Sequence, residues 1–171
     1  MRIATKTQTM PLLLCVIVIT GQSLAHDGAI GVVKERMDGM SSLGDHAKRV
    51  SRMLRGKTSF DLDAIDEAAH AFVEHGGKIP AFFPDTANSR ESAVTEALPA
   101  IWDNWDEFEA IATNFVRDSQ DLQSVVNDVS GRSINGKAQM SSVRSAFLKA
   151  AKNCSACHEQ FRLDSDAPHQ H

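Results

Sequence analysis

Apolar residues recur every three or four positions along most of this chain, which is the repeat of an amphipathic α-helix. Four stretches show the repeat: residues 28–55, 62–75, 99–130 and 136–163. In the first stretch the apolar stripe comprises Ile30, Val33, Met37, Met40, Leu43, Ala47, Val50 and Leu54. No stretch alternates apolar and polar residues as a half-buried strand does. The pattern therefore predicts an all-α chain with four long helices.

The connections between these stretches differ in length. Gly76 and Gly77 end the second stretch, as glycines commonly do at helix C-termini, and a longer loop with Pro80 follows. Pro99 falls in the first turn of the third stretch, where a proline is tolerated, and Gly131 follows the end of that stretch. Two short connections and one longer loop are typical of an antiparallel up-down four-helix bundle.

The fourth stretch contains Cys154-Ser155-Ala156-Cys157-His158. This CxxCH spacing is the attachment motif of a c-type haem. The two thiols can form thioethers with the two vinyl groups of one porphyrin, and the adjacent imidazole can ligate the iron. Cys154, Cys157 and His158 share one face of a helix, and that face carries the apolar stripe. We therefore expect one covalently bound haem c enclosed between the helices.

Two other kinds of site use a cysteine pair with this spacing. A redox disulfide usually accompanies a βαβ pattern, and no strand pattern surrounds this pair. A zinc site would need two more ligands, for which His169 and His171 are candidates. Histidines at a frayed chain end are poorly held, so haem attachment is the favoured interpretation.

The N-terminal segment has the organisation of an export signal. Arg2 and Lys6 precede an apolar run at residues 12–20, and small residues at Ser23 and Ala25 suit a cleavage site. The run is too short to span a membrane. We therefore expect this leader to be removed after export.

Cleavage would divide the chain into three parts. Residues 1–25 would form the signal peptide, residues 26–163 the four-helix cytochrome domain, and residues 164–171 a flexible tail. Cys15 would be lost with the leader, so that the motif cysteines would be the ones left in the mature chain. Haem c is attached in the bacterial periplasm, which is the expected location.

Charge and composition exclude several functions. The formal net charge is −4, and loss of Arg2 and Lys6 would make it more negative. The absence of a basic run with interleaved aromatic residues argues against nucleic-acid binding. The absence of a second apolar segment argues against stable membrane insertion. An acidic surface can steer a basic periplasmic redox partner, and no second constellation of acid, base and nucleophile suggests an enzyme.

Several short motifs also carry a family resemblance. Residues 34–40 read Lys-Glu-Arg-Met-Asp-Gly-Met and are similar to a K-x-R-x-x-x-(M/L) stretch that precedes a terminal CxxCH helix in one group of cytochromes. Further similar segments are residues 56–61, 79–85, 101–102 and 154–162. Together they resemble class II cytochromes c, the cytochrome c′ family, in which the motif lies on the last helix. The loop at 79–85 looks closer to the low-spin members.

The resemblance implies roles for residues around the haem. Cys154 and Cys157 would form the thioethers, and His158 would be the proximal iron ligand. Met40 would face the distal side of the haem, and Arg36 would lie near a propionate.

Two residues after the motif also receive roles from the resemblance. Phe161 would pack against the haem, and Arg162 would neighbour the proximal histidine. Homodimers are common in the family, so a homodimer is one assembly that the resemblance allows.

The sixth iron ligand decides between two functions. A bond from the Met40 sulfur would give a low-spin, single-electron carrier, whereas an apolar distal side without it would give a five-coordinate haem that binds nitric oxide or carbon monoxide. Methionine at this position occurs in both kinds of member. We expect the electron carrier, with Met37 packed in the core. His46, His70 and His75 are expected at the surface.

Overall fold

The structure is a computed structural model that describes residues 28–131 and 136–163. The expected signal peptide at residues 1–25 and the expected tail at residues 164–171 lie outside these ranges. His169 and His171, the candidate zinc ligands, are also outside them.

Four long helices make up most of the described residues. They are α1 (Gly31–Leu54), α2 (Leu62–Gly76), α5 (Trp105–Ser130) and α6 (Gly136–Phe161). The shorter elements are the 3-10 turn η2 (Pro80–Phe82) and the helices α3 (Ala87–Glu91) and α4 (Ala100–Asp103). Extended pairing in these ranges is limited to an isolated bridge between Ala97 and Arg162. The all-α prediction is confirmed.

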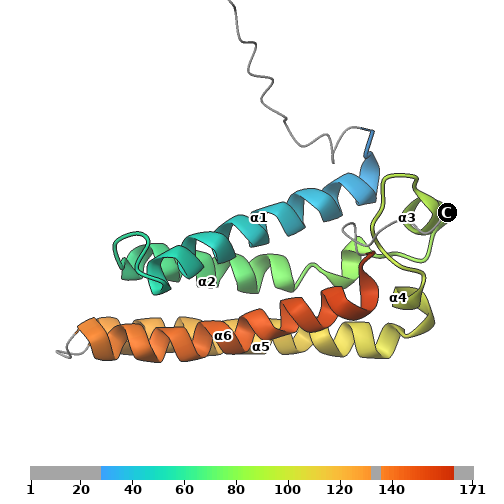
Figure 1. The fold of residues 1–171 in the computed structure, drawn as a ribbon. Helices are drawn as coiled ribbons and strands as arrows, with labels where there is room; N and C mark the ends of the chain where they lie inside the picture. The colour runs from blue at the N-terminus through green and yellow to red at the C-terminus, as the bar shows by residue number, and fades with distance from the viewer. Residues whose placement is uncertain (1–27, 132–135, 164–171) are drawn as a thin grey trace, which may run out of the picture.

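The long helices form an antiparallel up-down bundle (Figure 1). α5 packs against both α6 and α2, and α1 packs against α2. Direct contacts between α1 and α6 are far fewer, and α1 rises away from α6 toward its own N-terminus (Figure 1). The bundle is therefore least tightly closed at the end where α1 begins and α6 ends.

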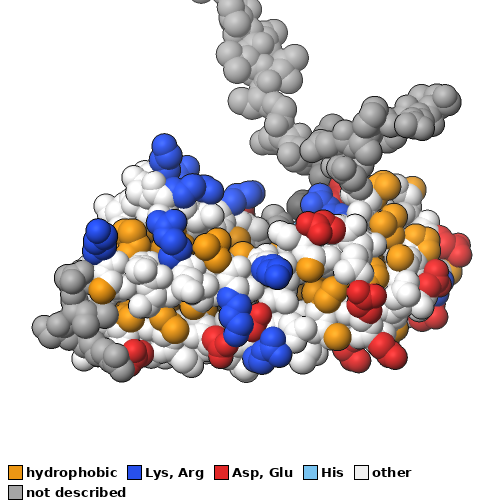
Figure 2. Space-filling view, turned by 60° about the horizontal axis from the view of Figure 1, so that its bottom comes forward, with side chains coloured by type: hydrophobic (Ala, Val, Ile, Leu, Met, Phe, Trp, Pro, Cys, Tyr) orange, Lys and Arg blue, Asp and Glu red, His pale blue; other side chains and the backbone are white. Residues whose placement is uncertain are grey.

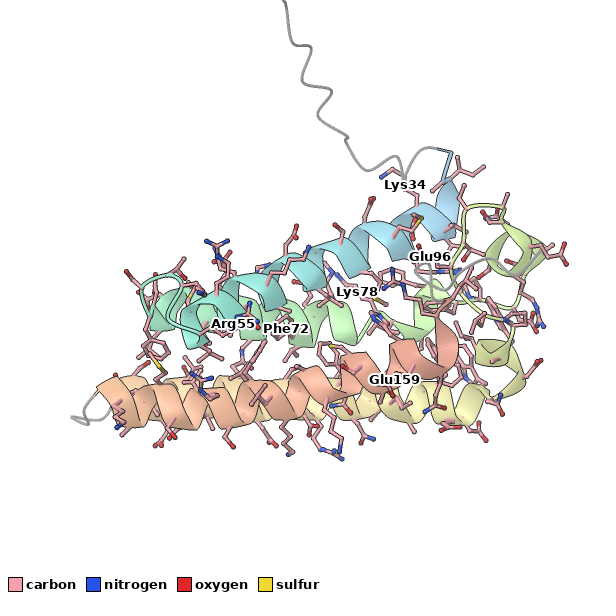
Figure 3. The ribbon with its side chains drawn as sticks, viewed as in Figure 1. Lys34, Arg55, Phe72, Lys78, Glu96 and Glu159 are labelled. Carbon is pink, nitrogen blue, oxygen red and sulfur yellow. The ribbon has the colours of Figure 1, made fainter. Side chains whose placement is uncertain are left out.

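The core follows the apolar stripes read from the sequence. Phe72 lies between the helices (Figure 3), and its ring is 5.8 Å from that of Phe115 and 6.4 Å from that of Phe147. Fully buried aliphatic residues continue this core along the bundle: Val50, Ile65, Leu122, Val126 and Val143. Burial of these side chains is the main source of stability, because isolated helices of this length are marginal in water.

Local signals place the turn between α1 and α2. Gly56 has a φ of +68°, and the backbone N–H groups of Gly56 and Lys57 donate to the carbonyls of Met53 and Arg52. This arrangement is a glycine-dependent helix C-cap. Asp61 then caps α2, because its carboxylate accepts a hydrogen bond from the Ala64 N–H at 3.1 Å.

Three local expectations were wrong. The stretch expected as one helix from Pro99 is two helices, because Asn104 leaves helical geometry and its side chain donates to the Ala100 carbonyl at 3.1 Å. The expected loop contains α3, which Thr86 caps by accepting a hydrogen bond from the Ser89 N–H. Ile30, assigned to the apolar stripe, is 71% exposed because it precedes the first turn of α1.

No helix in the described ranges combines the length and apolar character needed to cross a bilayer.

Candidate cofactor-binding site

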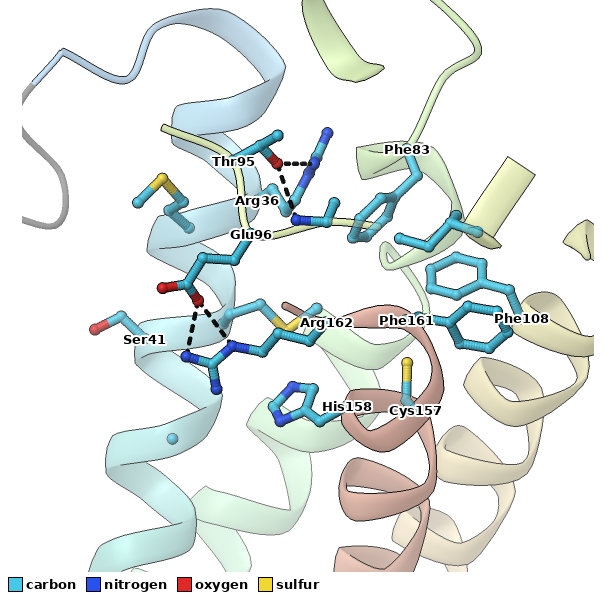
Figure 4. Close-up of a pocket in the computed structure, with 15 residues that line it drawn as sticks. Arg36, Ser41, Phe83, Thr95, Glu96, Phe108, Cys157, His158, Phe161 and Arg162 are labelled. Atoms are coloured by element: carbon cyan, nitrogen blue, oxygen red, sulfur yellow. Dashed lines mark hydrogen bonds and ion pairs between the residues drawn. The ribbon is translucent and has the colours of Figure 1, made fainter. Parts of the chain in front are cut away.

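The motif residues lie on the last turns of α6. Cys154 and Cys157 are half-buried free thiols, and His158 is exposed next to them. Both sulfur-bearing side chains pack against the hydrophobic core, which agrees with the helical register read from the sequence. The imidazole of His158 extends from α6 toward α1 (Figure 4). The helix therefore presents the two thiols and the imidazole together at the loosely closed end of the bundle.

A pocket of about 380 Å³ opens at this end. This volume falls within the usual range for small-molecule and cofactor sites. Its walls come from α1, α6, the α4–α5 region and the segment between α3 and α4. The lining residues from α1 are Arg36, Met37, Met40, Ser41 and Gly44, and those from α6 are Cys157, His158, Phe161 and Arg162.

Aromatic side chains form the apolar inner wall of the pocket. Phe161 is 3% exposed, and its ring meets that of Phe108 edge-on at 5.5 Å. Phe108 in turn meets Phe83 at 4.9 Å. Trp102 and Trp105 are half-buried against the core, and the Trp102 indole N–H donates to the Phe83 carbonyl at 3.0 Å. The inner wall is thus apolar and closely packed.

The wall opposite His158 contains two methionines from α1. Met40 is half-buried, lines the pocket and packs against the core. Met37 also lines the pocket but is not among the residues packed on that core. The expectation that Met37 fills the core is therefore wrong. One helical turn separates it from Met40 along α1, and both reach the same pocket.

Arg36 is buried at the upper edge of the pocket and is 5% exposed. Its Nε donates to the Phe82 carbonyl at 3.2 Å, its Nη1 to Thr95 Oγ1 at 2.9 Å, and its Nη2 to the carbonyl and Oγ of Ser89 at 3.2 and 2.8 Å. The guanidinium also lies 4.1 Å from the centre of the Phe83 ring. Four of its five N–H donors are thus committed to the chain between η2 and α4.

Arg162 lies beside His158 and pairs with Glu96. Its Nε and Nη2 both lie 2.8 Å from Glu96 Oε2 (Figure 4). Partial burial lowers the pKa of His158, the Arg162 charge lowers it further, and Glu96 opposes this effect. The imidazole is therefore neutral at pH 7 and has a nitrogen lone pair available for a metal.

Burial also changes the chemistry of the thiols. It raises the pKa of Cys154, and burial together with the neighbouring Cys154 raises the pKa of Cys157 to about 11. Both groups are protonated at neutral pH and are weak nucleophiles in the folded chain.

The residues fit a covalently attached haem better than a protein-only metal site. Two free thiols and an imidazole share one face of α6, and apolar walls enclose the space beside them. Among residues 28–131 and 136–163, no group of three or more His, Cys, Asp or Glu side chains is arranged to hold a metal ion. An iron held mainly by a porphyrin needs no such group.

The sequence predicted that most of these residues belong to one site, but part of the site was missed. The structure places Arg36, Met40, Cys157, His158, Phe161 and Arg162 around one pocket, with Cys154 one turn away on the core side. Of the other histidines, His70 is exposed as expected, while His46 and His75 are half-buried and do not line this pocket.

Three of the missed residues lie between α3 and α4. Thr95, Glu96 and Ala97 all line the pocket. This segment has no helical or strand period, so nothing in the local sequence predicted that it would reach α6.

Comparisons with known proteins agree with this site. A family model described as Cytochrome C' matches residues 31–162. Cytochrome c′ of Rhodopseudomonas palustris is 27% identical over 131 residues, which cover 77% of this chain and 81% of that protein. Cytochrome c-556 of Agrobacterium tumefaciens strain apple 185 is 26% identical over 141 residues, which cover 82% and 96% of the two chains.

Solved structures agree at the level of the fold. Cytochrome c′ from Rhodopseudomonas palustris superimposes with a TM-score of 0.68 at 24% identity, and the match covers 81% of this chain and 100% of the other. The family model spans the four-helix bundle from α1 to the CxxCH motif of α6. This protein therefore belongs to the cytochrome c′ family of class II c-type cytochromes, whose cofactor is covalently bound haem c.

Proposed function

We propose that this protein is a periplasmic single-electron carrier in which His158 and Met40 are the two axial ligands of the haem iron. The observation that carries the proposal is that these two side chains line the same pocket from different helices, α6 and α1. A haem c bound here supplies a one-electron Fe(II)/Fe(III) couple.

The side chains around the pocket would each contribute to that role. Cys154 and Cys157 would hold the porphyrin through thioethers, and the neutral imidazole of His158 would bind the iron. The thioether of Met40 would raise the reduction potential relative to a second histidine. Phe161 and Phe108 would exclude water from the inner side of the pocket.

The two arginines would differ in the number of N–H donors that they keep for a haem propionate. Arg162 is exposed and lines the pocket, so it can bind a carboxylate such as a haem propionate with the N–H donors that Glu96 leaves over. Arg36 retains at most one N–H for a propionate, because its other four donors are committed within the chain.

Absorption spectroscopy of the exported holoprotein tests the proposed ligation. The spectra of oxidised and reduced protein are recorded for the wild type, for Met40→Ala and for Met37→Ala as a matched control. Sharp reduced α and β bands in the wild type and Met37→Ala, lost in Met40→Ala, are the expected result. A broad high-spin spectrum in the wild type that Met40→Ala leaves unchanged would contradict it.

Binding of a small gas at the distal side is the second candidate function. Gly44 lines the same wall one helical turn after Met40, and a Cβ built on it would meet no atom within 4 Å, so the pocket has open space at this position. A variant of cytochrome c′ from Alcaligenes xylosoxidans with the same fold, at 19% identity and a TM-score of 0.63, is described as a nitric oxide complex. A large spectral change on addition of carbon monoxide to the reduced wild type would favour this candidate.

Export and cleavage form part of the proposal. We place the mature N-terminus at His26, the bundle domain at residues 26–163 and a tail at residues 164–171. Intact mass measurement on protein from the periplasmic fraction should give a chain that begins at His26 and carries one haem. A chain that retains residues 1–25 would contradict this assignment.

The surface suggests what kind of redox partner would bind. Acidic side chains gather at the end of the bundle where α4 lies, while Lys and Arg are more frequent toward the other end (Figure 2). Exposed carboxylates at the acidic end include Asp103, Asp106 and Glu107. A basic partner would be steered to this end, so the electron-transfer rate should fall as ionic strength rises.

A homodimer is the proposed assembly. One solved cytochrome c′ with this fold, at 18% identity and a TM-score of 0.65, is described as showing ligand-controlled dimer dissociation. Sedimentation of the holoprotein should give twice the chain mass, and a single-chain mass at all concentrations would contradict the proposal.

A further inference from the structure

The two helices that carry the proposed axial ligands have little direct contact with each other. α1 packs mainly on α2, whereas α6 packs mainly on α5. At the far end of the bundle, the Arg144 guanidinium of α6 donates to the Leu54 carbonyl at the end of α1. From that point α1 diverges from α6 toward the pocket (Figure 1). Something other than direct helix packing must therefore fix their separation at the pocket.

The segment Thr95–Leu98, here called the strap, is bound to the end of α6. The Leu98 N–H donates to the Phe161 carbonyl at 2.9 Å, and the Leu163 N–H donates to the Glu96 carbonyl at 2.7 Å. These bonds flank the antiparallel bridge between Ala97 and Arg162. The ion pair from Glu96 to Arg162 adds a side-chain link beside them.

The strap is also bound to α1. Thr95 Oγ1 accepts a hydrogen bond from Arg36 Nη1 at 2.9 Å, and the same oxygen accepts one from the Ala97 N–H at 3.2 Å (Figure 4). Arg36 precedes Met40 by about one helical turn, and Arg162 follows His158 by about one turn. The path from Arg36 through Thr95 and Glu96 to Arg162 therefore joins the two ligand-bearing helices across the pocket.

We propose that Thr95 and Glu96 are positioning residues that set the distance between the α1 wall and the α6 wall of the pocket. In this role they hold the Met40 thioether within reach of the group that His158 binds. The inference rests on the proposed His158–Met40 ligation for its ligand-binding readout, but its effect on the two helices does not depend on that ligation.

The two links differ in strength. The Arg36–Thr95 bond has a buried, charged donor, and such a bond contributes more than one between neutral groups. Glu96 and Arg162 are both nearly half exposed, so their ion pair is screened by solvent and contributes less. Removal of the Thr95 hydroxyl should therefore loosen the pocket more than neutralisation of Glu96.

The test uses conservative variants of the full holoprotein. Thr95→Val removes the acceptor and keeps the side-chain shape, and Glu96→Gln removes the charge and keeps the length. Asp85→Asn is the matched control, because Asp85 also forms an exposed ion pair between η2 and α4, with Arg90 at 2.7 Å, but reaches neither α1 nor α6. Far-UV circular dichroism checks that each variant is folded.

Two measurements are made on each variant. The first is amide hydrogen exchange of residues 36–44 and of the Leu98 and Leu163 N–H groups. The second is the dissociation constant of carbon monoxide for the reduced protein. If carbon monoxide must displace Met40, a weaker hold on α1 raises the apparent affinity. The apparent affinity for carbon monoxide is expected to rise about fivefold in Thr95→Val and about twofold in Glu96→Gln.

The outcomes test the proposed role of the strap independently of the proposed Met40 ligation. Faster exchange in α1 and at Leu98 in both variants, with Asp85→Asn unchanged, supports the strap even if the wild-type spectrum shows no methionine ligation. If exchange in both variants equals that of the wild type, the proposed role of Thr95 and Glu96 is overturned, even if the wild-type spectrum shows methionine ligation. Equal acceleration in Asp85→Asn also overturns it, since any loosening of the loop would then suffice.

Discussion

Asp118 Oδ2 on α5 accepts a hydrogen bond from Asn153 Nδ2 on α6 at 2.9 Å, one residue before the first cysteine of the haem motif. Asp118 is 4% exposed, and its other oxygen lies 3.1 Å from Lys149 Nζ and 3.3 Å from Arg117 Nη2. The carboxylate thereby fixes the register of α6 against α5 just before Cys154.

This carboxylate should make stability fall in acid. Burial alone would raise the pKa of Asp118, but hydrogen bonds from Asn153, Lys149 and Arg117 together bring it below the ordinary value. A group with a lowered folded-state pKa stabilises the protein above its unfolded pKa of about 3.9, and this stabilisation is lost as pH falls through the folded-state value. Urea unfolding from neutral pH downward measures the loss.

The variant Asp118→Asn tests whether this carboxylate causes the loss of stability in acid. We expect it to lower the free energy of unfolding by about 1–2 kcal/mol at neutral pH and to flatten the acid dependence. Asp121→Asn is the control, because Asp121 contacts the same Lys149 but is exposed. An acid dependence in Asp118→Asn as steep as that of the wild type would show that other carboxylates cause it.

Gly76 permits the close approach of α2 and α5. A Cβ at this position would lie 2.8 Å from Phe115 Cδ1 and 3.2 Å from Val116 Cγ2. Gly76→Ala should therefore force these helices apart and cost about 1–3 kcal/mol of unfolding free energy. Gly136→Ala, where a Cβ meets no atom within 4 Å, is the control and should not destabilise the protein. Thermal or urea unfolding of both variants measures the difference.

Arg36→Lys should destabilise the loop between η2 and α4 although it keeps the charge. An ammonium group cannot reproduce the planar fork that donates to Phe82, Thr95 and Ser89 together. We expect a loss of about 2–4 kcal/mol, since buried acceptors would lose their donors. Limited proteolysis should cut residues 83–95 faster.

Lys34→Met is the control for Arg36→Lys, because Lys34 is an exposed residue of the same helix and pairs with Asp38. It should change neither the unfolding free energy nor the cleavage rate appreciably. Equal cleavage of Arg36→Lys and wild type would show that the loop is held by other contacts.

The sequence predicted the parts of the fold that depend on helical periodicity. The register of Cys154, Cys157 and His158 on one face of α6 follows from the 3.6-residue repeat. The same repeat puts Met40 on the apolar stripe of α1, but its position opposite His158 was implied by the family resemblance. That repeat cannot distinguish Met37 from Met40, because residues three apart share a face. It also cannot reveal the break at Asn104, where apolar spacing continues across two helices.

The remaining part of the site could not be predicted from local patterns. The hydrogen bonds of Arg36 join residues 46 to 59 positions apart in sequence, and the strap reaches α6 across a similar separation. Such contacts depend on the assembled bundle and not on the sequence near each residue. The family resemblance placed Arg36 at the site, but it gave no indication that its guanidinium is largely committed to the loop.

A methyl NMR spectrum can show whether the Met40 sulfur is bonded to iron opposite His158. Reduced holoprotein with ¹³C-labelled methionine methyl groups is compared with Met40→Ala and Met37→Ala. If Met40 binds the iron, one methyl resonance is shifted far upfield by the haem ring current, and it is present in Met37→Ala and missing in Met40→Ala. A wild-type spectrum of a diamagnetic, low-spin protein without that resonance, or a paramagnetic high-spin spectrum, would contradict Met40 ligation.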